Sequence, residues 1–199
     1  QAAETLTEAH RSGELGDLVW VEARAHLPSW HSRRTSEAPW LAQGEAGGFL
    51  REVMSHHVFL ISRLLGTPVL SHAAVRRIGD AAEHHAVITL EAQGVPITIT
   101  GTTLGAGPEV HHVTFRGSRA TYRTRDLHWL DRFENDMWVE ALPASVHGES
   151  GSERGGERDT HLRQLDNLAC LLEGKPHTMA NFREALKVQE LIEAMHAVA

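Results

Sequence analysis

A series of short, strand-like runs between residues 69 and 130 constrains the fold more than any other feature of the sequence. The runs are rich in Val, Ile and Thr, glycines punctuate them, and they cover residues 69–79, 84–93, 96–104, 110–117 and 119–130. Runs of this kind between turn residues are typical of β-strands. Because short connections join antiparallel neighbours, the series predicts a mostly antiparallel sheet.

Helical patterns flank this series on both sides. The predicted helices cover a short segment at the start of the chain, closed by Gly13 or Gly16, and residues 48–65, 160–174 and 181–199. Gly66 supplies a C-cap for the second of these helices, and Asn181 with Glu184 forms a capping box for the last. Together, helices and strands predict an α+β fold in which the helices pack on one face of the sheet.

Three further segments complete this prediction. Residues 17–27 have the alternation of a strand, and residues 133–142 add an edge strand. Residues 143–159 are polar and rich in Gly and Ser, which is typical of a surface loop.

Composition excludes several classes of protein. The chain has 199 residues, of which 41% are hydrophobic, enough for the core of one domain. Its net charge is −7 and it contains no basic block, so nucleic acid is not an expected partner. No apolar run reaches the roughly 18 residues of a membrane span. The one cysteine, Cys170, precludes a disulfide within the chain, which favours a reducing, cytoplasmic location.

An acid and a histidine lie four residues apart in the predicted helix 48–65. Glu52 and His56 therefore share one face of the helix, just after the glycine pair Gly47-Gly48. A carboxylate beside an imidazole can fix the histidine tautomer and allow proton exchange near neutral pH. Pairs with this spacing are also common on exposed helix faces, where they contribute a few tenths of a kcal/mol. Spacing alone leaves both interpretations open.

The residue types allow two other kinds of site. Histidine is abundant, and a metal site could draw on Glu52, His56 and His57 or on the pairs His84-His85 and His111-His112. Adjacent histidines on a strand point to opposite faces, however, and no cluster has zinc spacing, so no metal is predicted. The long segment 28–48 holds Trp30, Arg33 and Arg34, and its arginines could bind a carboxylate or phosphate. A solvated loop with the tryptophan packed inward is the alternative.

The segment around Glu52 resembles a known family motif. Residues 47–56 read GGFLREVMSH, and the apolar helix that follows closes at Leu65-Gly66. This order is similar to that in the C-terminal domain of the Gfo/Idh/MocA (glucose–fructose oxidoreductase/inositol dehydrogenase) family of NAD(P)-dependent oxidoreductases. Residues 12–24 and 168–195 resemble the first strand and the closing helices of that domain, and residues 114–123 resemble one of its hairpins without its second glycine.

The resemblance implies a fold and a domain organisation. It implies a glyceraldehyde-3-phosphate dehydrogenase-like C-terminal domain over residues 16–199, and a linker helix over residues 1–15 that follows a Rossmann domain outside this sequence. NAD or NADP would bind mainly in that Rossmann domain. The open face of the sheet would form a homodimer or tetramer interface.

The resemblance also implies roles for individual residues in an enzyme that acts on a sugar, a polyol or a related hydroxyl compound. His56 would exchange a proton with the substrate hydroxyl, Glu52 would be the neighbouring acid, and Gly47 and Gly48 would lie beside the cofactor. Trp30, Arg33, Arg34 and His161 are candidates for substrate contacts. Glu52 replaces the usual Asp and Met54 a common Gly, which leaves open a non-catalytic ligand-binding or dimerisation module with the same fold.

Overall fold

The structure is a computed structural model that describes residues 2–30, 36, 38–142 and 153–197. It contains one 8-stranded sheet in the order β2-β3-β4-β1-β5-β6-β7-β8. The strands are β1 (Leu18–His26), β2 (Val69–Arg76), β3 (His85–Ala92), β4 (Val95–Thr102), β5 (Val110–Gly117), β6 (Thr121–Arg125), β7 (Trp129–Glu134) and β8 (Met137–Glu140).

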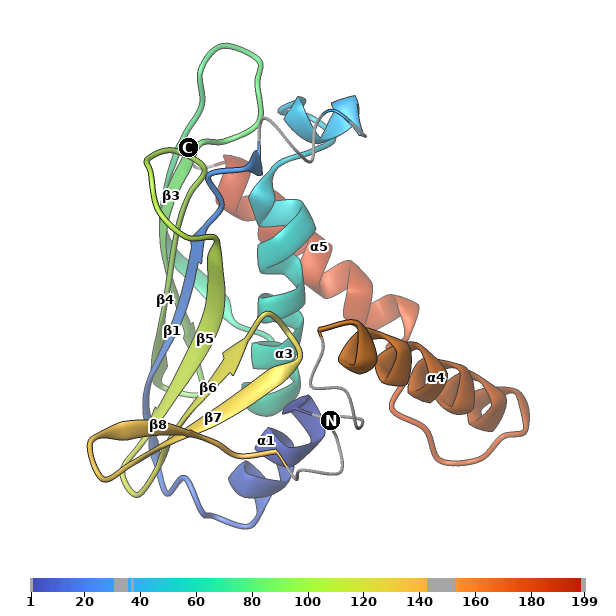
Figure 1. The fold of residues 1–199 in the computed structure, drawn as a ribbon. Helices are drawn as coiled ribbons and strands as arrows, with labels where there is room; N and C mark the ends of the chain where they lie inside the picture. Colours follow the sequence, from blue (N-terminus) through green and yellow to red (C-terminus); the bar gives the residue numbers. More distant parts are fainter. Residues whose placement is uncertain (1, 31–35, 37, 143–152, 198–199) are drawn as a thin grey trace.

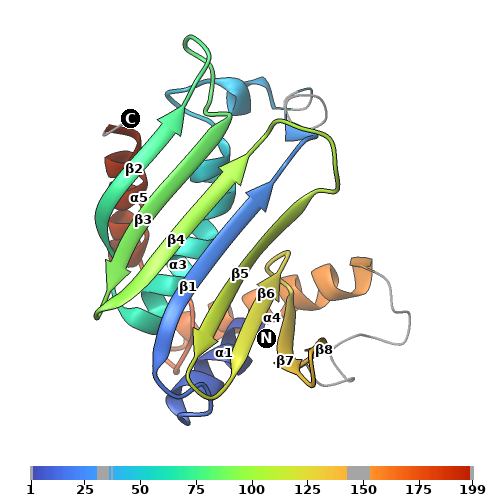
Figure 2. The same cartoon turned by 90° about the vertical axis from the view of Figure 1, so that its left-hand side faces the viewer.

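Helices cover one face of this sheet and leave the other bare, as the predicted α+β fold requires (Figures 1 and 2). The helical elements are α1 (Ala2–Arg11), the 3-10 turn η2 (Pro39–Ala42), the π turn η3 (Leu50–Met54), α3 (Ser55–Leu65), α4 (Glu153–Leu172) and α5 (Phe182–Ala197), of which α4 extends away from the sheet. No helix in the described part of the chain is long and apolar enough to cross a membrane.

All neighbouring strands are antiparallel except β1 and β4, which run parallel. Helix α3 and strands β2 and β3 intervene between them in sequence, so the chain returns to the edge of β1 only after a long crossover. Parallel neighbours need such a crossover. The mostly antiparallel sheet predicted from the short connections is thus confirmed, with one parallel pair at its centre.

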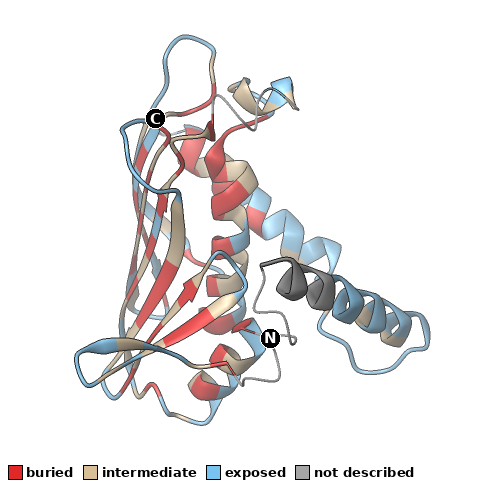
Figure 3. Ribbon diagram, viewed as in Figure 1, coloured by how far each residue is buried: buried red, intermediate tan, exposed pale blue. Residues whose placement is uncertain are grey.

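The core lies between the sheet and helices α1, α3 and α5 (Figure 3). On β1, alternate residues Val21, Ala23 and Ala25 face the helices and are buried. On α3 the buried side chains include Val58 and Ile61, one turn apart. The alternation of the strands and the helical spacing of α3 therefore bury their apolar positions in the same layer.

Three predicted boundaries were wrong. The expected strand 119–130 is a hairpin of β6 and β7, because Asp126 and Leu127 adopt left-handed backbone with φ of 50° and 63° and reverse the chain. The predicted loop 143–159 ends early, since α4 begins at Glu153 despite its glycines; residues 143–152 lie outside the described residues. The single helix expected from Gly48 begins instead with the π turn η3.

Candidate active site

The glycine pair before η3 is enclosed by this chain's own atoms. Gly47 and Gly48 are both buried. A Cβ on Gly47 would overlap the backbone of Leu41, and one on Gly48, whose φ is +105°, would overlap the carboxylate of Glu83. Glycine is required at both positions by close internal packing. The predicted place of these glycines beside a cofactor is therefore not needed to explain them.

Glu83 is the residue that holds the start of η3, and sequence reasoning did not find it. Its side chain is fully buried, and its Oε1 accepts a hydrogen bond of 2.7 Å from the backbone N–H of Leu50. Among the described residues its Oε2 has no hydrogen-bond partner. Burial raises the pKa of the Glu83 carboxyl, while the Leu50 N–H and the charges of Arg51 and Arg77 act in the opposite direction. A lone Glu between two turns carries no sequence signal for this role.

Arg51 ties the same turn to α5. Its guanidinium donates two hydrogen bonds to the Glu193 carboxylate, at 2.7 and 2.8 Å, and two more to the carbonyls of Gly44 and Gly47, at 2.9 and 3.0 Å. The hydrogen bond to Glu193 raises the pKa of Arg51, and the same bond lowers the pKa of Glu193. This bidentate contact fixes the orientation of the Arg51 guanidinium relative to the Glu193 carboxylate as well as their distance.

Glu52 and His56 lie on the turn that these contacts hold. Glu52 is half-buried in η3, and His56 is exposed in the first turn of α3. Within the described residues their side chains form no hydrogen bond with each other. The π turn is wider than an α-helical turn and changes the direction of Glu52 relative to His56. The structure thus brings the two groups to one helix start without pairing them directly.

His57 is the fully buried histidine of the helix. Its ring packs on the ring of His111 from β5, with centroids 5.6 Å apart, and Nε2 of His111 lies 3.4 Å from Oδ1 of Asp126. Neither ring nitrogen of His57 has a hydrogen-bond partner among the described residues. Burial above all, and then the neighbouring histidines, lower the pKa of His57 to about 3. The ring is therefore neutral in the folded chain.

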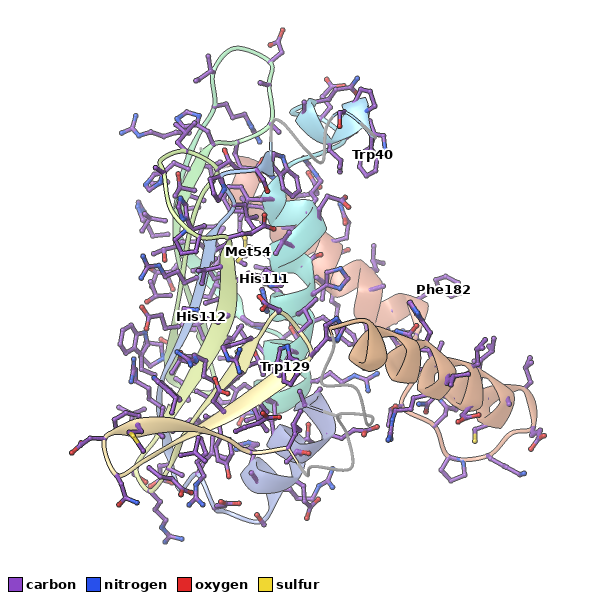
Figure 4. All side chains as sticks on the ribbon, viewed as in Figure 1. Trp40, Met54, His111, His112, Trp129 and Phe182 are labelled. Carbon is purple, nitrogen blue, oxygen red and sulfur yellow. The ribbon has the colours of Figure 1, made fainter. Side chains whose placement is uncertain are left out.

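The histidine pairs do not converge on a metal site in the described ranges. The rings of His111 and His112 leave β5 on opposite faces, with His111 toward α3 (Figure 4). No group of three or more metal-ligating side chains forms in the part of the chain that the structure describes.

The remaining predicted residues are spread over the fold. Trp30 is fully buried in the core, which matches the inward-packed alternative for this side chain. Arg33 and Arg34 lie outside the described residues. His161 is exposed on α4, the helix that extends away from the sheet (Figure 1). Met54 is also fully buried, so its extra volume fills the core and leaves the surface near His56 unchanged.

The arrangement provides one exposed proton-exchanging group on a fixed support. An exposed imidazole on a turn that is anchored from two sides can exchange a proton with a hydroxyl bound beside it. A half-buried carboxylate one turn away can hold a second polar group of the same ligand or orient the imidazole.

Comparison with known proteins identifies this domain. The family model for the GFO/IDH/MocA C-terminal domain matches residues 3–123, more than half of the chain. The chain belongs to the Gfo/Idh/MocA family. Its fold is the mostly antiparallel α+β fold of that family's C-terminal domain, and in this family the domain pairs with an N-terminal Rossmann domain. No curated protein matches the sequence.

Several solved structures share this Gfo/Idh/MocA fold. An oxidoreductase from Agrobacterium radiobacter, in complex with NAD+, L-tartaric acid and magnesium, has a TM-score of 0.74 at 19% identity over 100% of this chain and 59% of its own. The WlbA dehydrogenase from Bordetella pertussis, in complex with NADH and UDP-GlcNAcA, gives 0.69 at 22% identity, and myo-inositol 2-dehydrogenase from Lactobacillus plantarum gives 0.69 at 19%, each over 100% of this chain and 59% of its own. The chain thus spans about three fifths of the length of these proteins.

Proposed function

We propose that this chain is the substrate-binding and oligomerisation domain of an NAD(P)-dependent oxidoreductase that acts on a sugar, a polyol or a related hydroxyl compound. One observation carries the proposal. The exposed His56 and the half-buried Glu52 share a helix start that the buried Glu83 and the Arg51–Glu193 pair hold in place. A surface acid–histidine pair without a function would not need such an anchored support.

His56 would act on the proton of the substrate hydroxyl. Its imidazole takes this proton when the hydroxyl is oxidised and returns it in the reverse direction. Glu52 lies one turn earlier and would hold a neighbouring hydroxyl of the substrate or orient the imidazole. Nicotinamide, when bound in the full-length protein, supplies the acceptor or donor of the hydride.

The described residues of this chain do not form a cradle for the cofactor. Gly47 and Gly48 are covered by Leu41 and Glu83. The Gly105-Ala106-Gly107 turn leads into the strand β5, whereas a phosphate-binding glycine loop leads into a helix. We therefore assign NAD or NADP to the N-terminal Rossmann domain with which domains of this family pair, and derive no step at the cofactor from this chain.

A non-catalytic module with the same fold is the second candidate. It is favoured by the absence of a direct Glu52–His56 hydrogen bond among the described residues and by the change from Asp to Glu at position 52. Hydride transfer by the full-length protein across a panel of sugars and polyols separates the two. Turnover that is lost in His56→Ala supports the enzyme, and turnover that His56→Ala leaves intact refutes the role of His56.

A second copy of the chain is the proposed partner of the bare sheet face. Figure 2 shows this face uncovered by helices. The strand register places polar and aromatic side chains of β6, β7 and β8 on it. Asp131 binds Arg123 and Arg125 at 2.8 and 2.6 Å, and the Arg123 guanidinium lies 4.2 Å from the ring centre of Trp138. Aromatic residues and arginine are enriched where interfaces bury surface.

Sedimentation of the full-length protein tests this interface. Val87 is exposed on β3 and points to the bare face, as its alternation with the buried Ala86 and Ile88 shows. We expect Val87→Glu to shift the protein toward the monomer, while Lys187→Glu on the helix-covered side leaves its mass unchanged. An unchanged mass for both variants contradicts the interface.

The single Cys170 also makes the cytoplasm the proposed location.

A further inference from the structure

Helix α4 carries a row of exposed leucines. Leu162, Leu165, Leu168 and Leu172 recur at helical spacing, so they form one side of α4, called here the leucine face. All four are exposed, from 39% for Leu168 to 79% for Leu172. Figure 3 colours most of the described residues of α4 as exposed. A continuous row of exposed leucines usually marks a contact with another surface.

The first turn of α5 carries a further exposed apolar side chain. Phe182 is 96% exposed there, and Figure 4 shows its ring pointing away from the sheet and α3. The connection between α4 and α5 is nevertheless well defined. Asn167 accepts hydrogen bonds from the backbone N–H and the hydroxyl of Thr178, at 2.9 and 3.1 Å, and Arg63 pairs with Glu184 at 3.0 Å. These contacts therefore hold in place the connection between the two helices that carry the exposed apolar side chains.

Burial of these side chains would be strongly favourable. Full burial of a leucine or phenylalanine side chain stabilises a protein because it removes apolar surface from water. Isolated helices gain little stability from their own hydrogen bonds and depend on packing of an apolar face. In the described residues α4 lacks such packing, so a partner surface is required.

Two observations select the partner. Helix α1, the first described element, begins beside α4 on the helix-covered side of the sheet in both views (Figures 1 and 2). The solved structures of the same fold are longer, since this chain covers 59% of their length, and domains of this family pair with an N-terminal Rossmann domain. A second copy on the bare sheet face would lie on the opposite side from α4.

We propose that the leucine face of α4, together with Phe182, is the docking surface for the N-terminal nucleotide-binding domain of the full-length protein. The proposal rests on the proposed function, because it requires a two-domain oxidoreductase. It also gives His161 a place. His161 precedes Leu165 by four residues and Leu168 by seven, so it lies on the leucine face and would reach the boundary between the two domains.

Hydrogen exchange in the full-length protein tests the docking directly. We expect the backbone amides of α4 to exchange at least tenfold more slowly than those of a helix that packs against no other surface. Leu165→Asp should remove this protection. Arg163→Asp places the same side chain on the opposite side of α4 and should leave protection intact. Leu165→Asp should also weaken NAD(P)H binding by at least tenfold without changing the oligomeric state.

Three outcomes overturn the proposal. They are fast exchange throughout α4 in the wild-type protein, equal effects of the two aspartate variants, and dissociation of the oligomer by Leu165→Asp with cofactor binding unchanged. The last result would assign the leucine face to a second copy. The wild-type measurement needs no variant, so a misfolded variant does not obscure it. Failure of the proposed function would give a different result. His56→Ala would then be as active as wild type, while the amides of α4 would still be protected from exchange.

Discussion

The backbone N–H of Leu50 donates a 2.7 Å hydrogen bond to Glu83, a fully buried carboxyl 33 residues further along the chain. This bond joins the turn before β3 to the start of the helix that carries Glu52 and His56. Because Gly48 lies against the same carboxyl, one buried side chain sets both the path of the glycine pair and the beginning of η3. The geometry of the candidate active site therefore depends on a residue that does not belong to it.

Replacement of Glu83 should destabilise the fold. Glu83→Ala leaves the Leu50 N–H buried without an acceptor, which costs about 1–3 kcal/mol. Glu83→Gln keeps a carbonyl oxygen at the same place and should lose much less of the free energy of unfolding. Urea unfolding of the full-length protein and both variants provides the measurement. If Glu83→Ala unfolds at the wild-type urea concentration, the anchoring role is wrong.

Gly48 should tolerate no side chain. Gly48→Ala would combine a left-handed backbone, worth about 1–3 kcal/mol of strain, with overlap against the Glu83 carboxylate. Gly13→Ala is a matched control, since Gly13 also has a positive φ, +77°, but no atom lies within 4 Å of the position that its methyl group would take. We expect the Gly48 variant to lower the melting temperature more than the control does. Equal shifts would show that backbone strain alone accounts for the glycine.

Acid sensitivity should depend on His57. Its pKa is about 3 in the folded chain and close to 6.5 when unfolded, so between these pH values the unfolded chain binds more protons. Stability therefore falls as the pH drops from 6.5 toward 3, and His57→Phe should make this loss shallower. Burial also lowers the pKa of His196, to about 4, so part of the slope remains.

The free energy of unfolding of wild type and His57→Phe, measured from pH 7 to pH 4, shows this effect. The same substitution at His128, which is exposed in the turn between β6 and β7, is the control for the loss of an imidazole. Parallel pH curves for wild type and His57→Phe would contradict a neutral, unpartnered His57.

Periodicity predicted most of the fold, because strands such as β1, β3, β4 and β6 alternate between buried and more open residues and helix α3 repeats its apolar positions. The capping box at Asn181 and Glu184 formed as predicted, with bonds of 2.9 Å in both directions. The turn at Asp126 and Leu127 was missed because leucine rarely adopts left-handed backbone. It is stabilised by strand pairing on both sides, which local sequence does not reveal.

The candidate site was predicted only as far as local spacing extends. Glu52 and His56 were found because they are four residues apart. Glu83 and Glu193 hold their turn from distant parts of the chain, and no local pattern connects those residues to it. The π turn was missed for the same reason, since its geometry follows from these tertiary contacts. The glycine pair was found, but its cause proved to be packing within the domain.

Hydride transfer by the full-length protein, with His56 replaced, tests the central claim most directly. With a sugar or polyol that the wild-type protein oxidises, His56→Ala should lower kcat/KM by about 10²–10⁴-fold, the usual contribution of a general acid or base. His128→Ala, which removes an exposed histidine from the turn between β6 and β7, should retain wild-type activity. Turnover by His56→Ala at the wild-type rate would contradict the account.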